Sequence, residues 1–462
     1  MSRADKDTAQ KKTPQQKPAQ QDPDTSIEKL SARYAAFDAL QSITRDGLSL
    51  DEAFEQALKK QGIEGGRERA FARQVLMSTL RHIPAIDKIM NQNMDKQLED
   101  RDLATRNWLR LGLAQVLFME IEDRAAVHST VELMGQSRDK GVRNKKGLAN
   151  AVLRNTVRTK DKKLAQIKNP LTSLAAWLRK RWTSNYGSET VLSIARQALV
   201  EPPVDLSLKP GERAEKWAET LGGKAMGTSV VRLDKAGDIA RLEGYEDGKW
   251  WVQDVAATIP ARLLGDVKGK DVADLCAAPG GKTLQLAAQG AHVFAIDRSG
   301  QRLKRLRDNL KRTGLTAQIV EADALDWMPG QTFEHILLDA PCSATGTIRR
   351  HPDLAINKTS GDIIGLSGLQ AKLLRRAFDH LAPQGTLLYC TCSLEPEEGE
   401  EVINAFLQEQ PTAQNTPITA DEIAPIPASA ITDSGFVRTI PCMLEDDGGM
   451  DGFFMARLTK KV

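Results

Sequence analysis

Five short apolar runs follow Trp250 and are separated mostly by segments with helical periodicity. The runs are DVADLC (271–276), AHVFAID (291–297), AQIVEAD (317–323), HILLDAP (335–341) and GTLLYCTC (385–392). Short strands that alternate with helices are typical of a parallel sheet covered by helices on both faces. The alternation therefore predicts a doubly wound α/β domain, completed by strand-like runs near 435–440 and 452–458.

The front of the chain follows a different pattern, because its apolar residues recur at three- and four-residue steps. Ile27, Leu30, Tyr34, Phe37 and Leu40 begin this pattern, and it continues to about residue 154 with few strand-like runs. Such periodicity indicates amphipathic helices. Their succession predicts an all-α bundle.

Changes in composition divide the 462 residues into four parts. Residues 1–24 are rich in Lys, Gln, Pro and Asp, which is typical of a disordered tail. Residues 25–165 form the predicted bundle, 166–245 a small α+β or linker domain, and 246–462 the α/β domain. A chain of this length is expected to hold roughly three domains, so the division agrees with its size.

No apolar run approaches the roughly 20 residues of a spanning helix, and the N-terminus lacks the apolar core of a signal peptide. We therefore expect a cytoplasmic protein without membrane contact. The five cysteines have no disulfide-like spacing, and the sequence has no CxxC pair or close Cys/His cluster. They are expected to be reduced thiols, and no metal site is predicted.

A dense basic stretch runs from Arg138 to Arg181, with fourteen Lys or Arg residues against two acids. Trp177 and Trp182 lie at its far end. Clustered cations of this kind suit a polyanion such as nucleic acid. The alternative is a solvated helix face with long cationic side chains, and the stretch alone does not decide between them.

The loop DLCAAPGGKT (274–283) ends in Gly-Gly-Lys-Thr, like a phosphate-binding loop. A Walker A loop requires Gly-x-x-x-x-Gly-Lys-Ser/Thr, but its first glycine position holds Cys276 here. Pro279 also removes a backbone N–H group from any anion-binding loop. A nucleoside triphosphatase, with Asp339 in a Walker B strand, is therefore the weaker alternative.

The acid that ends the next apolar run indicates another nucleoside ligand. Asp297 lies seventeen residues beyond Gly280, and in doubly wound folds an acid in this place binds ribose hydroxyl groups. A nucleoside without a phosphate chain fits, and S-adenosylmethionine is the commonest such cofactor. Asp323, which ends the third run, could accept from the adenine amino group. The structural alternative for each acid is a helix cap.

Two cysteines follow the last two runs, Cys342 in DAPCSATG (339–346) and Cys392 in YCTCS (389–393). The carboxyl ends of strands face the ligand crevice, so both thiols are expected beside the cofactor. Carbon 5 of a pyrimidine is a poor nucleophile, and a thiolate that attacks carbon 6 converts the ring to an enamine that accepts a methyl group. A pair of crevice thiols therefore favours pyrimidine methylation over simple packing.

These motifs, together with RRHPD (349–353), resemble those of the RNA cytosine-5 methyltransferases, which have a Rossmann-like class I methyltransferase domain. The resemblance implies that Cys392 is the nucleophile, that Cys342 helps to break down the covalent adduct, and that Asp339 touches the cofactor or the N3/N4 edge of cytosine. The family pattern also implies that S-adenosylmethionine is held by Cys276, Ala277, Ala278, Pro279, Gly280, Gly281, Lys282, Asp297, Asp323 and Asp339.

The front half resembles the all-α antitermination factor NusB through LRLGLAQVLFM (109–119), AVHSTVELM (126–134) and KGLANAVLR (146–154). A NusB-like bundle fused to this catalytic domain resembles the branch of the family that methylates small-subunit (16S) ribosomal RNA. The resemblance implies a single-stranded or loop cytosine as substrate, and we expect a monomer. The alternatives are a non-catalytic RNA-binding or assembly factor and a methyltransferase for another RNA.

Overall fold

The computed structural model describes residues 23–462 and side chains from residue 30 onward. Residues 1–22, and with them nearly all of the predicted tail, lie outside the described part. Residues 23 and 24 were assigned to that tail but begin the first helix. In the described residues, no helix is both long and apolar enough to cross a bilayer.

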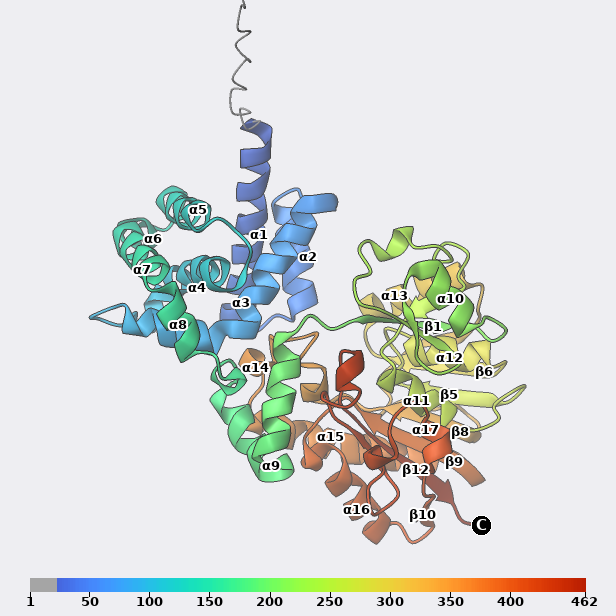
Figure 1. The fold of residues 1–462 in the computed structure, drawn as a ribbon. Helices are drawn as coiled ribbons and strands as arrows, with labels where there is room; N and C mark the ends of the chain where they lie inside the picture. The colour runs from blue at the N-terminus through green and yellow to red at the C-terminus, as the bar shows by residue number, and fades with distance from the viewer. Residues whose placement is uncertain (1–22) are drawn as a thin grey trace, which may run out of the picture.

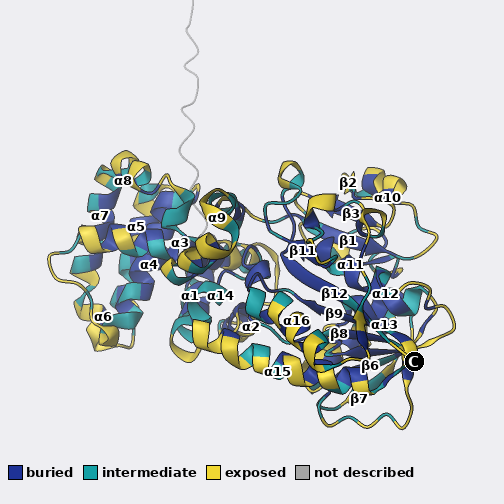
Figure 2. Ribbon diagram, turned by 90° about the horizontal axis from the view of Figure 1, so that it is seen from below, coloured by how far each residue is buried: buried dark blue, intermediate teal, exposed yellow. Residues whose placement is uncertain are grey.

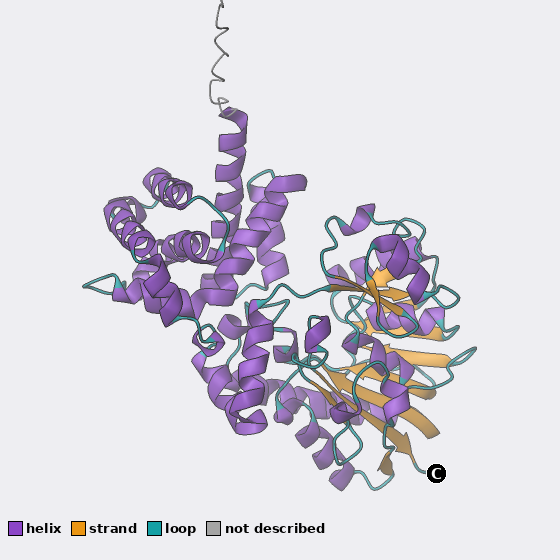
Figure 3. Ribbon diagram, viewed as in Figure 1, coloured by secondary structure: helices purple, strands orange, loops and turns teal. Residues whose placement is uncertain are grey.

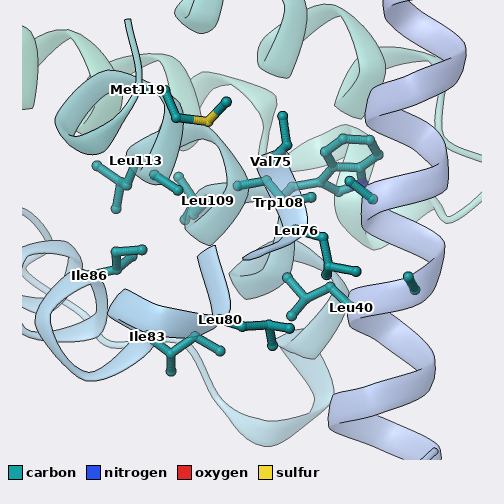
Figure 4. Packing of buried hydrophobic residues seen from close by; sticks show 14 of the residues in the cluster. Leu40, Val75, Leu76, Leu80, Ile83, Ile86, Trp108, Leu109, Leu113 and Met119 are labelled. Carbon is teal, nitrogen blue, oxygen red and sulfur yellow. The ribbon is translucent and has the colours of Figure 1, made fainter. Parts of the chain in front are cut away.

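The N-terminal part is helical, as its periodicity predicted (Figures 1 and 3). Its core is built by α1, α3 and α4, where Leu40, Leu76 and Leu109 are fully buried (Figure 4). Trp108 stacks on Phe37 with ring centroids 4.1 Å apart. The helices are α1 (Pro23–Asp46), α2 (Leu50–Lys60), α3 (Gly66–Gln92), α4 (Leu103–Phe118), α5 (Asp123–Gln136), α6 (Lys140–Asn144), α7 (Lys146–Arg158) and α8 (Lys160–Gln166).

A long helix and a small antiparallel sheet follow the bundle. Helix α9 (Ala176–Leu199) runs beside the C-terminal part (Figure 1). The sheet has the order β2-β3-β1-β4, and β4 lies beyond residue 245, where the sequence placed the end of this domain. Its elements are β1 (Val204–Leu208), α10 (Ala214–Leu221), β2 (Lys224–Ala225), β3 (Val230–Leu233) and β4 (Trp250–Val252).

The C-terminal part contains one large sheet with the order β10-β12-β9-β8-β5-β6-β7, and β11 pairs with β12. Strands β5 to β9 are parallel, and β12 is antiparallel to β9. This mixed sheet confirms the predicted α/β methyltransferase fold class. The strands are β5 (Asp271–Leu275), β6 (His292–Asp297), β7 (Gln318–Glu321), β8 (Phe333–Asp339), β9 (Leu381–Thr391), β10 (Ala413–Asn415), β11 (Val437–Thr439) and β12 (Phe453–Lys460).

Helices cover both faces of this sheet, so its central strands are buried (Figure 2). Leu337 and Leu338 of β8 and Leu387 and Leu388 of β9 have no exposed surface, as expected of strands between two helical layers. Polar groups of these strands must therefore emerge at their ends. The helices of this part of the chain are α11 (Ile259–Arg262), α12 (Gly281–Ala288), α13 (Gly300–Thr313), α14 (Leu354–Asn357), α15 (Ser360–Asp379), α16 (Glu400–Glu409) and α17 (Ala420–Ile423), of which α14 contacts α1 of the bundle.

The helical bundle is docked on the C-terminal part through the segment after β8. Asp353 accepts a hydrogen bond from the backbone N–H of Leu50, at the first turn of α2 (3.0 Å). Asn357 donates to the carbonyl oxygen of Leu48 (2.9 Å). The acid of the RRHPD motif therefore joins the bundle to the sheet domain.

Candidate active site

The loop between β5 and α12 is shaped by its small residues. Cys276 and Gly280 both have positive φ, 62° and 108°. A Cβ atom on Gly280 would lie 2.3 Å from Cδ1 of Leu306, so only glycine fits where the loop approaches α13. The loop backbone thus passes close to the side chain of Leu306 on α13.

Lys282 at the start of α12 points toward β8. Its Nζ atom lies 2.8 Å from Oδ2 of Asp339, and both side chains are largely removed from solvent. Burial alone would lower the pKa of Lys282, but Asp339, together with the nearby Cys390 and Cys392, raises it. Lys282 is therefore a fixed cation that orients Asp339. In a phosphate-binding loop the lysine amine would contact the phosphate ligand, whereas here it is paired with a carboxylate of the protein.

Asp274, the last acid of β5, is fully buried and interacts electrostatically with both members of this pair. Its Oδ2 atom accepts a hydrogen bond from the hydroxyl of Thr283 (2.6 Å), whereas Oδ1 has no hydrogen-bond partner. Burial raises the pKa of Asp274 to about 7. Sequence reasoning did not single out this residue, because an acid inside an apolar run resembles any strand position until its burial is known.

The two acids predicted to hold a nucleoside lie on one cavity of about 80 Å³, together with Cys276 and the apolar side chain of Leu369. Asp297 accepts from the backbone N–H of Ala278 (3.1 Å) and of Ser299 (2.9 Å). Its carboxylate therefore also anchors the glycine loop.

Arg302 crosses the same cavity, 3.4 Å from Oδ2 of Asp297. Its guanidinium group also donates to the carbonyl oxygen of Ala278. Asp323, which also lines this cavity, accepts from the N–H of Leu325 (3.0 Å). Each carboxylate keeps lone pairs for a further donor, because a carboxylate offers about four acceptor sites.

The structure brings the two predicted thiols together. The sulfur atoms of Cys342 and Cys392 are 3.5 Å apart, and either thiol can donate to the other. Both residues are partly exposed, so a base can approach them. The hydrogen bond to Cys392 and burial raise the pKa of Cys342, and Cys342 therefore keeps its proton at neutral pH.

Close backbone contacts hold together the two thiol loops, which are the segment after β8 that carries Cys342 and the segment after β9 that carries Cys392. The N–H of Gly346 donates to the carbonyl oxygen of Cys392 (3.0 Å). A Cβ atom on Gly346 would lie 2.0 Å from the carbonyl oxygen of Gly452. Cys390, two residues before Cys392, is fully buried and its thiol lies 3.5 Å from Oδ1 of Asp339, so it lies outside the accessible pair.

The end of the basic stretch has a structural role that the sequence did not indicate. Arg181 of α9 pairs with Glu395 (2.8 Å) and Glu397 (2.6 Å), just after Cys392. Trp182 is fully buried and donates to Glu395 (2.8 Å). Trp177 donates to the carbonyl oxygen of Ala355 (3.1 Å). These groups bind α9 to the catalytic domain and are not free to contact nucleic acid.

The arginines of the RRHPD motif are likewise engaged inside the protein. Arg350 donates to Asp254 (2.8 Å) and to Asp451 (3.1 Å). Arg349 is fully buried and donates to Asp451 (3.4 Å). In residues 23–462, no group of three or more His, Cys, Asp or Glu side chains could hold a metal ion.

Comparison with known proteins identifies the family. A sequence model of the 16S rRNA methyltransferase RsmB/F family matches residues 261–459, and one of the NusB family matches residues 30–158. The ribosomal RNA small subunit methyltransferase B of Cronobacter sakazakii is 33% identical over 452 residues, 94% of this chain and 100% of that protein. The chain belongs to the 16S rRNA methyltransferase RsmB/F family. The protein of the same name from Escherichia coli O157:H7 is 33% identical over 93% of this chain and 98% of its own length.

Solved structures agree with this fold. PH0851 superposes with a TM-score of 0.75 at 22% identity, covering 94% of this chain and 99% of its own. NSun6 from Pyrococcus horikoshii, solved with SFG, has a TM-score of 0.52 at 20% identity and covers 62% of this chain and 98% of its own. By its sequence matches to the family model and to these relatives, the chain is an S-adenosylmethionine-dependent RNA cytosine-C5 methyltransferase, as its motifs predicted.

Proposed function

We propose that this RsmB/F family member methylates carbon 5 of a cytosine in small-subunit ribosomal RNA through a covalent adduct with Cys392. The observation that carries the proposal is the 3.5 Å separation of two partly exposed thiols at the ends of β8 and β9. Asp339 ends β8 beside them and is held by Lys282. Thiols and acid thereby lie at the carboxyl ends of adjacent parallel strands, the edge at which a doubly wound sheet binds its ligands.

The donor set fits S-adenosylmethionine. Two carboxylates with spare acceptor capacity, Asp297 and Asp323, share a cavity with apolar walls, which suits a ribose and an adenine ring. In this proposal the cofactor is held by these acids, by Cys276, Ala277, Ala278, Pro279, Gly280, Gly281 and Lys282, and by Asp339. Bound there, it supplies an electrophilic methyl group.

Cys392 acts as the nucleophile. Its thiolate forms a bond to carbon 6 of cytosine, and the electron pair of the C5–C6 double bond moves to carbon 5. Carbon 5 would then take the methyl group, whose former bonding pair would stay on the sulfur of the donor. Asp339, oriented by Lys282, is placed to bind the N3/N4 edge of the ring. Asp339 and Lys282 are held in their ion pair before the cytosine binds, so these side chains need little reorganisation during the reaction.

Cys342 acts when the adduct breaks down. Solvent water takes the proton from carbon 5, its bonding electrons re-form the C5–C6 double bond, and the sulfur of Cys392 leaves carbon 6 as a thiolate. Cys342 lies within 3.5 Å of that sulfur and retains its own proton. It is therefore placed to assist the release of Cys392.

The substrate cytosine must leave its stack to reach both thiols, which favours an unpaired or loop nucleotide. A groove of about 1380 Å³ between α5 and α7 is lined by exposed Arg124, Lys146, Arg154 and Arg158, which outnumber its acids Glu122, Asp123 and Glu132. We assign RNA contacts to this groove and thus to residues 25–165, with 166–245 as a linking domain and 246–462 as the catalytic domain. The reaction takes place in the cytoplasm, where bacterial ribosomes are assembled, and one chain carries every proposed site residue, which supports a monomer.

The test is a denaturing gel of protein mixed with RNA and S-adenosylmethionine. The Cys342→Ala variant is expected to accumulate a protein–RNA adduct, because it attacks but releases slowly. The Cys392→Ala variant is expected to give no adduct and no 5-methylcytosine. An adduct from the Cys392 variant and none from the Cys342 variant would reverse the assignment.

A further inference from the structure

A single buried carboxylate joins the two thiol loops. Oε1 of Glu398 accepts from the backbone N–H of Ser343 (2.8 Å). Oε2 accepts from the hydroxyl of Ser393 (2.6 Å) and from that of Ser343. Ser343 directly follows Cys342, and Ser393 directly follows Cys392. One side chain is thus bonded to the neighbour of each thiol.

The same residue fixes the other flank of each cysteine. Gln370 donates to Oε1 of Glu398 (3.1 Å) and to the carbonyl oxygen of Pro341 (2.9 Å), just before Cys342. The carbonyl oxygen of Glu398 accepts from the hydroxyls of Tyr389 (2.9 Å) and Thr391 (3.2 Å). Thr391 directly precedes Cys392. Both cysteines are therefore held from two sides.

This network lies entirely inside the protein. The side chains of Glu398, Ser343, Ser393 and Gln370 belong to residues with no exposed surface. Glu398 is bonded to hydroxyl and amide groups, and burial raises its pKa. A fully hydrogen-bonded buried network is rigid, whereas an apolar residue here would leave several donors unsatisfied at a cost in stability.

We propose that Glu398 is the positioning residue that sets the separation between the sulfur atoms of Cys342 and Cys392. Its catalytic consequence rests on the proposed function, but the proximity of two thiols can be measured without any methyl transfer. Glu398 touches neither sulfur and acts through the serine that follows each cysteine.

The first measurement is steady-state methylation by the full chain carrying Glu398→Ala. Because a misplacement of about 1 Å in a catalytic group can cost 100-fold in rate, kcat is expected to fall by about 100-fold. The KM values for RNA and cofactor should change by no more than about twofold, since Glu398 contacts neither cavity. Glu398→Gln retains an acceptor for Ser343 and lets the Ser393 hydroxyl turn, so it should restore most of kcat. Glu401→Ala, on the exposed face of α16, is the matched control.

The second measurement follows thiol proximity directly. Diamide takes two hydrogens from a pair of neighbouring thiols, is reduced to the hydrazine, and leaves a disulfide. In the wild-type protein the Cys342–Cys392 disulfide should form rapidly, as quantified by mass spectrometry of peptides. In Glu398→Ala it should form about tenfold more slowly, because the second thiolate reaches its partner less often.

Loss of kcat in Glu398→Ala with an unchanged rate of disulfide formation would overturn the positioning role. Wild-type behaviour in both measurements would do the same. If the alanine variant does not fold, Glu398→Asp replaces it: the shorter carboxylate cannot bond both loops, so both rates should fall, and unaltered rates would refute the proposal. Absence of methylation by the wild type, with the disulfide result as expected, would reject the proposed function alone.

Discussion

The buried carboxyl group of Asp274, whose Oδ1 atom has no hydrogen-bond partner, makes a specific prediction about stability and pH. Because burial raises its pKa from 3.8 to about 7, the folded protein prefers the protonated acid. Its contribution to stability is complete below the unfolded-state pKa and is lost as pH rises toward 7. Each pH unit in this window changes the free energy of unfolding by about 1.4 kcal/mol, which gives a loss of about 4 kcal/mol by pH 8.

Asp274→Asn removes this titration while keeping an acceptor for Thr283. The free energy of unfolding of the variant, minus that of the wild type, should rise by about 4 kcal/mol between pH 4 and pH 8. The buried amide adds a constant offset of about 1–3 kcal/mol if it lacks a partner, and this offset does not alter the slope. The difference in the free energy of unfolding is measured by urea unfolding, monitored through the hydrogen-exchange protection of the amides of β5.

Asp271→Asn is the matched control, because this acid lies on the same strand but is exposed. Its profile should run parallel to that of the wild type. Parallel profiles for Asp274→Asn and the wild type across pH 4–8 would refute the reasoning, since they would mean that Asp274 titrates alike in the folded and unfolded chains.

Two further predictions concern the thiol loops and the groove of the bundle. Gly346→Ala places a methyl group 2.0 Å from the carbonyl oxygen of Gly452. Overpacking of this kind costs about 1–3 kcal/mol of stability, so the melting temperature and kcat of this variant should both fall. Gly365→Ala on α15, whose added methyl group would meet no atom within 4 Å, should lower neither. Unchanged kcat in Gly346→Ala would contradict the close fit. Arg154→Ala should reduce the slope of log K against log salt for RNA binding by about 1. Lys59→Ala on α2, outside the groove, should leave this slope unchanged. Equal slopes for the two variants would contradict the assignment of RNA contacts to the groove.

The sequence predicted those features that depend on local pattern. Alternating apolar runs identified the α/β sheet, and strand ends identified Cys342 and Cys392 as neighbours. The roles of Arg181 and Trp182 could not be predicted, because their partner Glu395 lies more than two hundred residues away. The stretch therefore resembled an RNA-binding surface, although its last members bind the protein itself.

Buried polar groups were the other features that pattern alone missed. Glu398 lies in the acidic run EPEEGEE (395–401), where every acid resembles a solvated surface residue. Its role depends on Ser343, which reaches it only after β8 and β9 have paired. Asp274 was passed over for the same reason, since burial and missing partners are properties of the folded chain.

The contact between Asp353 and the first turn of α2 has a consequence for how an RNA target is chosen. Asp353 lies on the same segment as Cys342, only eleven residues further along the chain. An RNA bound to the helical bundle would therefore keep a fixed position relative to Cys342, since hydrogen bonds and not a free linker join the bundle to the segment that carries this thiol. The distance between the RNA contacts on the bundle and the thiols would then be constant. A cytosine would be selected by its distance along the RNA from those contacts as well as by the bases around it.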